Sequence, residues 1–303
     1  MLIQKALAPY MVRASGYGWP RPSQASGHAA AGAVFSVIEL HHGNAVEAFL
    51  TGEAFTIGMT GETSGFLPVT TPDLNDLVRH EDYQEICSFC AEIHLKSEHN
   101  LLGELLPDYA AEDFILFESD HFVVIPGVGA VCDGYVLISP KEHVLSFGHL
   151  SPTLDAELDD VCQRTAGFLR KHYGRRVLAF EHGAESFRNR GGSCTDHAHM
   201  HMFPAVPEID IATGVRRDFE LRSVNDFLPA LRHQVQERQK PYLWLRSDDG
   251  RMWICDAPSA LSQYVRRIIV GQLGRADEWD WAVFPGIEHL CSTIETFRVF
   301  PNG

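Results

Sequence analysis

The chain has 303 residues, of which 45% are hydrophobic and 21% charged, so it is long enough to bury a substantial core and is not typical of a disordered protein. Its net charge of −15 argues against sequence-independent binding to nucleic acid or to an anionic membrane, since both require a basic surface. An odd number of scattered cysteines argues against a disulfide framework, and we find no signal peptide or long apolar run, so we expect a cytoplasmic protein.

The beginning of the chain gives no functional signal. Residues 34–40 and 54–58 are typical of short strands, and residues 75–80 of a helical turn. We treat residues 1–80 as an N-terminal extension of undefined fold.

Two cysteines separated by two residues, Cys87 and Cys90, begin the informative part of the chain. Thiolates at this spacing can both bind one tetrahedral zinc ion, which then needs two more ligands from elsewhere. A redox pair is the alternative, but it usually opens a helix after a strand, and that layout is not evident here. The spacing favours zinc, and the candidate partners are His94, His99, His143, His149 and His197.

The middle of the chain predicts four strands and one long helix. The helix begins at Ser151, where Pro152 takes the first helical position, and it ends before Gly174. Apolar runs bounded by turn residues predict strands over residues 114–118, 122–126, 135–139 and 176–180.

Three histidines alternate along the chain, at His197, His199 and His201. In a β-strand alternate side chains point to the same face, so we expect the three imidazoles to line one face while the residues between them face the core. Imidazoles in this arrangement can bind a metal, attack an electrophile or transfer protons. The pattern favours a functional site over three solvated side chains.

A glycine-rich turn comes just before these histidines. Because glycine has no Cβ, backbone N–H groups in such a turn can approach an anion closely. We therefore expect an anion site at Gly191, Gly192, Ser193 and Cys194.

Beyond residue 204 the chain becomes more highly charged. Residues 216–239 are mostly typical of helix, residues 242–246 and 252–255 of a hairpin, and residues 259–273 of an amphipathic helix. The aromatic cluster at residues 278–281 is interpreted as a plug in a core or an interface rather than a surface for stacking bases.

The order of these parts over about residues 85–205 resembles the histidine-triad (HIT) superfamily of nucleotide hydrolases and transferases. The resemblance rests on the Cys-x-x-Cys pair, a strand ending in Pro140-Lys141-Glu142-His143, a helix, a strand, the glycine-rich turn and His-x-His-x-His. It implies an α+β fold, with a HIT-like antiparallel sheet of about five strands and packed helices in residues 81–205. Residues 206–303 would form an α/β C-terminal extension that packs on this core.

The resemblance also implies a zinc site and a nucleophile. Zn²⁺ would be held by Cys87, Cys90, His143 and His197, and a shell of four protein ligands leaves no open position for water, so its role would be structural. His199 would attack the α-phosphorus of a nucleotide and form a covalent nucleotidyl-histidine.

His201 would then face the leaving group and, with the glycine-rich turn, contact the phosphate. Histidine at this third position favours a hydrolase of nucleotidyl phosphoesters, phosphoanhydrides or phosphoramidates, because members that use an external acceptor commonly carry glutamine there. The partner would be a nucleotide or a nucleotidylated small molecule, and a homodimer is left open. A nucleotidyltransferase or phosphorylase is the first alternative, and a non-catalytic HIT-like binding protein is the second.

A further alternative is a hydrolase with one catalytic metal on all three triad imidazoles. We do not favour this alternative, because it assigns no role to Cys87, Cys90 and His143.

The sequence departs from the family pattern in two places. Glu181-His182-Gly183 stands where Asn-x-Gly is common, and no carboxylate lies near Pro126-Gly127, where an acid usually binds the ribose hydroxyls. Asp133 and Asp120 are the candidates to replace that acid. The departure puts the nucleoside in doubt while leaving the phosphate chemistry in place.

Overall fold

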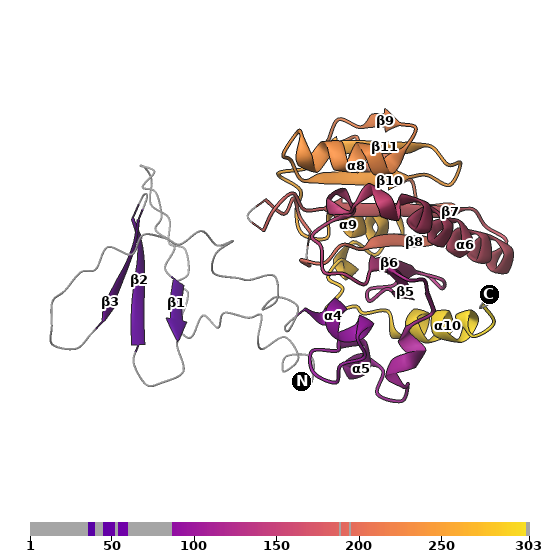
Figure 1. The fold of residues 1–303 in the computed structure, drawn as a ribbon, viewed down its shortest axis with the longest axis horizontal. Helices are drawn as coiled ribbons and strands as arrows, with labels where there is room; N and C mark the ends of the chain where they lie inside the picture. The colour runs from indigo at the N-terminus through magenta and orange to yellow at the C-terminus, as the bar shows by residue number, and fades with distance from the viewer. Residues whose placement is uncertain are drawn as a thin grey trace. The chain divides into compact units, whose positions relative to one another are not determined.

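The computed structural model describes residues 36–39, 45–51, 54–59 and 87–300, except Arg188 and Cys194. The chain divides into two compact units, Met1–Val78 and Arg79–Gly303 (Figure 1). The candidate site lies in the second unit.

The first unit contains a three-stranded antiparallel sheet in the order β1-β2-β3. Its strands are β1 (Ser36–Glu39), β2 (Ala45–Thr51) and β3 (Ala54–Met59). The strands predicted within residues 34–40 and 54–58 are thus present, whereas the helical turn predicted at residues 75–80 lies outside the described residues.

The second unit is built on an eight-stranded sheet in the order β4-β5-β6-β8-β7-β10-β11-β9, in which every neighbouring pair is antiparallel. Its strands are β4 (Phe117–Glu118), β5 (Phe122–Pro126), β6 (Val136–Pro140), β7 (Val177–Gly183), β8 (Met200–Pro204), β9 (Arg222–Val224), β10 (Tyr242–Arg246) and β11 (Met252–Asp256).

The expected number of about five strands is therefore wrong, although the antiparallel arrangement is as expected. Strands β4 to β8 make five, and the hairpin β10–β11 adds to the free edge of β7, where Tyr242 pairs with Gly183 and Arg246 with Ala179. An unpaired strand edge presents a row of N–H and C=O groups that another strand can satisfy. Here that strand comes from the C-terminal third of the same chain.

The long helix forms as predicted. A 3₁₀ turn, η3 (Pro152–Leu154), leads into α6 (Asp155–Tyr173), and the Ser151 hydroxyl accepts a hydrogen bond from the Thr153 N–H. The helix ends at Gly174, whose φ of 63° is left-handed and thus readily adopted by glycine.

Helices α6 and α8 (Phe227–Gln236) cover one face of the sheet and lie in front of it in Figure 1. On this face Cys162 Sγ of α6 lies 4.0 Å from Met200 Sδ of β8. His201 alternates with Met200 and therefore points to the opposite face. That second face is covered by α9 (Tyr264–Gln272), which contacts α7 (Ile211–Val215).

Some predicted elements differ from the structure. Of the strand predicted at residues 114–118 only β4 forms, at Phe117–Glu118, and Phe114 instead ends a 3₁₀ turn, η1 (Ala111–Phe114). The helical segment predicted over residues 216–239 is interrupted by β9, because its backbone pairs with β11. Sequence reasoning missed α4 (Ser88–Ile93), α5 (Leu101–Leu105) and α10 (Ile287–Phe297), and further short 3₁₀ turns are η2 (Phe147–His149) and η4 (Ala276–Glu278). None of the described helices is long and apolar enough to span a membrane.

Candidate metal centre and histidine site

Four metal-binding side chains from three separate segments meet at one point. The ligand atoms of Cys87, Cys90, His143 and His197 all lie within 4.8 Å of one another. The two cysteines belong to the first turn of α4, His143 follows β6, and His197 precedes β8. These are the four ligands implied by the sequence resemblance, whereas the other candidates, His94, His99 and His149, lie outside this cluster.

The spacing of these atoms suits a tetrahedral ion. With Zn–S near 2.3 Å and Zn–N near 2.0–2.1 Å, sulfur and nitrogen ligands of one zinc ion lie about 3.6 Å apart. The observed distances are 3.6 Å from Cys87 Sγ to His197 Nδ1, 3.5 Å from Cys90 Sγ to the same nitrogen, and 3.3 Å from Cys90 Sγ to His143 Nδ1.

The hydrogen bonds and charges around the cluster fit the same conclusion. His197 Nε2 lies 2.9 Å from the Pro140 carbonyl oxygen, and since a carbonyl only accepts, Nε2 carries the proton and Nδ1 presents its lone pair to the sulfurs. The pKa of Cys87 is lowered, chiefly by a hydrogen bond with Cys90, and the pKa of Cys90 is raised. A dication favours both thiolates at once. The residues present therefore fit a metal ion.

The middle histidine of the triad is held by the backbone next to it. His199 Nδ1 lies 2.8 Å from the His197 carbonyl oxygen and 3.3 Å from Thr195 Oγ1. The carbonyl requires a proton on Nδ1, so Nε2 keeps its lone pair. Burial lowers the pKa of His199 to about 4, which keeps the imidazole neutral near pH 7.

Phe89 links this histidine to the metal-binding turn. Phe89 stands between Cys87 and Cys90 in the sequence. Its ring centroid lies 5.5 Å from that of His197 and 4.9 Å from that of His199. Phe89 therefore places α4 in contact with the His199 ring.

His201 is the one triad histidine that lies within β8. The expectation that all three belong to one strand is thus wrong, because β8 begins at Met200 and the preceding segment turns toward the metal cluster. His201 Nδ1 lies 2.9 Å from the Tyr135 hydroxyl, and its ring stacks on Phe180 at a centroid distance of 4.2 Å. Burial lowers the pKa of His201 well below its ordinary value, so this ring is also neutral.

A small cavity joins these histidines to the C-terminal part of the chain. It has a volume of about 40 Å³, and among the predicted site residues it is lined by His199, His201, Gly192 and Ser193. Sequence reasoning missed the other lining residues, which are Val128, Gly129, Tyr135, Phe180, His182, Gln263, Arg266 and Trp281. The sequence held a signal for only two of them: Phe180 and His182 alternate along β7 and therefore share one face of the sheet. To place that face at the cavity, one must also know that β7 lies beside β8.

The C-terminal wall of this cavity is anchored by Arg266. Its guanidinium donates to the carbonyl oxygens of Trp279 at 2.7 Å, Glu278 at 2.9 Å and Phe284 at 3.1 Å, and also to that of Gly129. Trp281 N donates to Gln263 Oε1 at 3.0 Å. The aromatic cluster predicted to be a plug thus places Trp281 against the histidine site.

The glycine-rich turn is packed more tightly than the sequence suggested. Gly191 and Gly192 have left-handed φ values of 55° and 82°. A Cβ on Gly192 would lie 2.5 Å from the Leu261 carbonyl oxygen, so the space that this glycine leaves open is filled by the C-terminal part of the chain. The Ser193 N–H donates to the Arg190 carbonyl at 3.0 Å. Gly191 does not line the cavity, and Cys194 lies outside the described residues.

No carboxylate is found among the described residues that line the cavity. Asp133 is instead 2.6 Å from His289 Nδ1 and accepts from Ser292 Oγ at 2.9 Å, both in α10, and Asp120 is exposed. Neither residue replaces the missing ribose acid in this cavity.

Comparison with known proteins does not establish a family. No family model matches the chain, and no curated protein matches it. Among solved structures, one that resembles it is the crystal structure of a Zn-bound histidine triad family protein from Mycobacterium smegmatis, with 17% sequence identity and a TM-score of 0.32. That match covers 52% of this chain and 97% of the other.

Proposed function

We propose that this protein is a HIT-type nucleotide hydrolase that works through a covalent nucleotidyl-histidine on His199. The observation that supports it most directly is the 2.8 Å hydrogen bond from His199 Nδ1 to the His197 carbonyl, because it leaves the lone pair on Nε2. A neutral, oriented imidazole is the form that acts as a nucleophile.

The reaction follows from this geometry in two steps. In the first, His199 Nε2 forms a bond to the α-phosphorus while the bond from phosphorus to the leaving oxygen or nitrogen breaks. His201, held at Nδ1 by the Tyr135 hydroxyl, donates a hydrogen bond from Nε2 to the phosphoryl or leaving group. In the second, water attacks the same phosphorus and releases a proton to the solvent, and the N–P bond breaks with its electron pair returning to Nε2, so that His199 is neutral again.

We infer that Cys87, Cys90, His143 and His197 hold a zinc ion that serves a structural role. Four protein ligands complete a tetrahedral shell, so the ion supplies a cross-link between three segments and no open coordination site. Through Phe89 and the chain from His197 to His199, this cross-link would hold the nucleophile in position.

The cavity as it stands is too small for a nucleotide, because a volume of about 40 Å³ has room for only a few waters. The substrate would be a nucleotide or a nucleotidylated small molecule, and its nucleoside must enter where the segment around Trp281 now packs.

Trapping of the intermediate tests the proposal. The full chain is mixed with a panel of α-labelled nucleoside polyphosphates and phosphoramidates, quenched rapidly, and analysed for acid-labile protein-bound label. We expect label in the wild type and none in His199→Ala, with turnover reduced by about a thousandfold or more. His172→Ala, on the exposed side of α6, is the matched control and should behave as wild type.

Two other outcomes would contradict the proposal. An adduct that clears only when a second substrate is added would identify a transferase. No adduct and no turnover across the panel, combined with saturable binding of a nucleotide, would identify a binding protein.

A further inference from the structure

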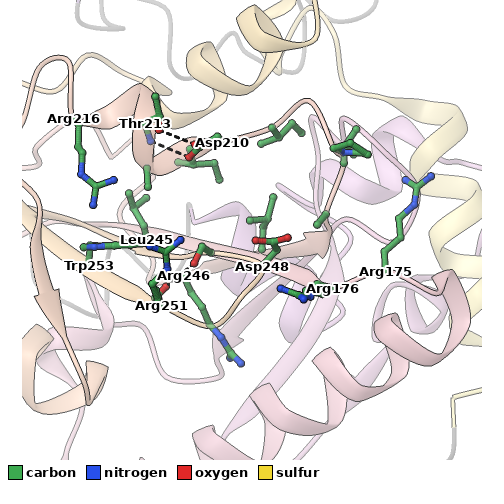
Figure 2. Close-up of a pocket in the computed structure, with 18 residues that line it drawn as sticks. Arg175, Arg176, Asp210, Thr213, Arg216, Leu245, Arg246, Asp248, Arg251 and Trp253 are labelled. Carbon is green, nitrogen blue, oxygen red and sulfur yellow. Dashed lines mark hydrogen bonds between the residues drawn. The ribbon is translucent and has the colours of Figure 1, made fainter.

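A second pocket lies at the far end of β8 from His199. It has a volume of 660 Å³, and Ala205, which follows β8, is part of its wall. His199 precedes β8, so the five residues of this strand separate the two sites, roughly 17 Å at about 3.3 Å per residue. Figure 2 shows that the lining side chains come from three places, the start of β7, the segment around α7, and the β10–β11 hairpin.

The pocket is basic although the chain as a whole is acidic. Five arginines line it, at positions 175, 176, 216, 246 and 251, against two aspartates, Asp210 and Asp248. The Asp210 carboxylate is occupied locally, because it accepts from the Thr213 N–H at 3.0 Å and from Thr213 Oγ1 at 2.7 Å (Figure 2). Because the chain has a net charge of −15, the presence of five arginines around one pocket requires a physical explanation.

Three of these arginines have no partner within the described part of the chain. Arg175, Arg176 and Arg246 make no side-chain hydrogen bond or ion pair there, and Arg175 and Arg176 are exposed. Several other arginines of the same unit are paired, such as Arg232 with Asp155 at 2.5 Å, whereas the exposed Arg170 and Arg217 are not paired with any described residue. Three of the five arginines that line the pocket are thus available to bind an anion.

The other two arginines stack on an aromatic ring, and Arg251 also forms an ion pair with Asp249, 2.7 Å from Nε to Oδ2. The guanidinium carbon of Arg216 lies 5.1 Å from the Trp253 ring centroid, and that of Arg251 lies 5.3 Å from it. Stacking of this kind restricts a flexible side chain before any ligand arrives. Trp253 itself is 6% exposed, so the ring provides a rigid support.

We propose that this pocket is a second binding site, for a small anion that carries at least two phosphoryl groups. Guanidinium groups bind phosphate oxygens in pairs, and several arginines from three segments match several phosphoryl groups better than one. The volume lies within the usual range for small-molecule pockets. The acidic surface elsewhere disfavours a long nucleic acid as the occupant.

Calorimetric titration of the full chain with tripolyphosphate at fixed ionic strength tests this site. We expect saturable binding of one tripolyphosphate, at least tenfold tighter than that of inorganic phosphate. Arg176→Gln and Arg246→Gln should each weaken it by about tenfold, the loss expected for one charge-assisted contact. Arg170→Gln, which removes the same charge from the exposed end of α6, should leave the affinity within twofold of wild type.

Binding in His199→Ala separates the two sites. We expect this variant to bind tripolyphosphate as wild type does, whereas loss of binding would place the anion at the histidine site and overturn the proposal. Absence of saturable binding, or equal weakening by Arg170→Gln, would also overturn it. Tighter binding of a single-stranded oligonucleotide, weakened by the same pocket substitutions, would replace it with a nucleic-acid surface.

Discussion

At the scale of single residues, two backbone carbonyls assign different roles to neighbouring histidines. His197 donates from Nε2 to the Pro140 carbonyl and turns Nδ1 toward the sulfurs, whereas His199 donates from Nδ1 to the His197 carbonyl and leaves Nε2 with its lone pair. Opposite tautomers two residues apart therefore leave Nδ1 of His197 available to a metal ion and Nε2 of His199 available for the nucleophilic attack that we propose. Glu181 of β7 is also unusual, because its carboxyl group is completely buried.

Substitution of Glu181 tests the cost of that burial. Burial raises its pKa from 4.5 to about 8, although the Phe147 N–H and the Tyr242 hydroxyl both donate to it. A raised pKa means that the folded state binds the proton more tightly, so this contribution to stability is present below pH 4.5 and is lost as the pH rises toward 8. Glutamine does not ionise, so the stability of Glu181→Gln does not fall with pH for this reason.

We therefore expect the unfolding free energy of Glu181→Gln, relative to wild type, to increase between pH 5 and pH 8. The slope should reach at most about 1.4 kcal/mol per pH unit. Urea unfolding at several pH values measures it, with the exposed Glu220→Gln as control. A difference that is constant with pH would show that Glu181 stays ionised in the folded protein.

At the scale of elements, the short helix α4 depends on the metal cluster for its position. It has six residues and no side-chain hydrogen bond at its N-terminus, so it is too short to be stable by itself. Phe89, in the first turn, packs against both His197 and His199. Loss of the proposed metal should therefore affect the proposed nucleophile, His199, as well as the helix.

Cys90→Ser tests this coupling. We expect wild-type protein to contain close to one zinc per chain, and Cys90→Ser to lose the metal and to unfold at a lower temperature, because structural zinc contributes directly to folding. Cys255→Ser, at a buried thiol outside the cluster, should also lose some stability but keep its zinc. Zinc analysis and thermal unfolding measure both effects, and a zinc-free wild type of full stability would contradict the metal assignment.

At the scale of the whole molecule, the C-terminal third completes both the sheet and the histidine site. Strand β10 pairs with β7, and this brings the following residues Gln263, Arg266 and Trp281 over His199 and His201. The resulting cavity is smaller than a nucleotide. Opening of the segment that carries Trp281 is therefore expected to precede binding.

Trp281→Ala tests whether that segment limits access. We expect the reaction of His199 with diethylpyrocarbonate to be several-fold faster in this variant, because the reagent modifies neutral imidazole nitrogen and the wall is removed. Trp279→Ala is the matched control, since this ring stacks with Arg267 and does not line the cavity. Mass spectrometry of the modified peptide measures the rate, and equal rates in both variants would exclude Trp281 as the barrier.

The sequence by itself determined the features that depend on local chemistry. The strand Phe122–Pro126 and the helix ending at Gly174 follow from local periodicity and capping, and the four proposed ligands follow from the resemblance of motifs. Only the tertiary structure decided that the sheet has eight strands, that β8 starts after His199, and that Trp281 closes the cavity. The physical reason is that strand pairing and carbonyl positions are set by residues distant in the chain, and any free edge presents the same backbone groups to many candidate partners.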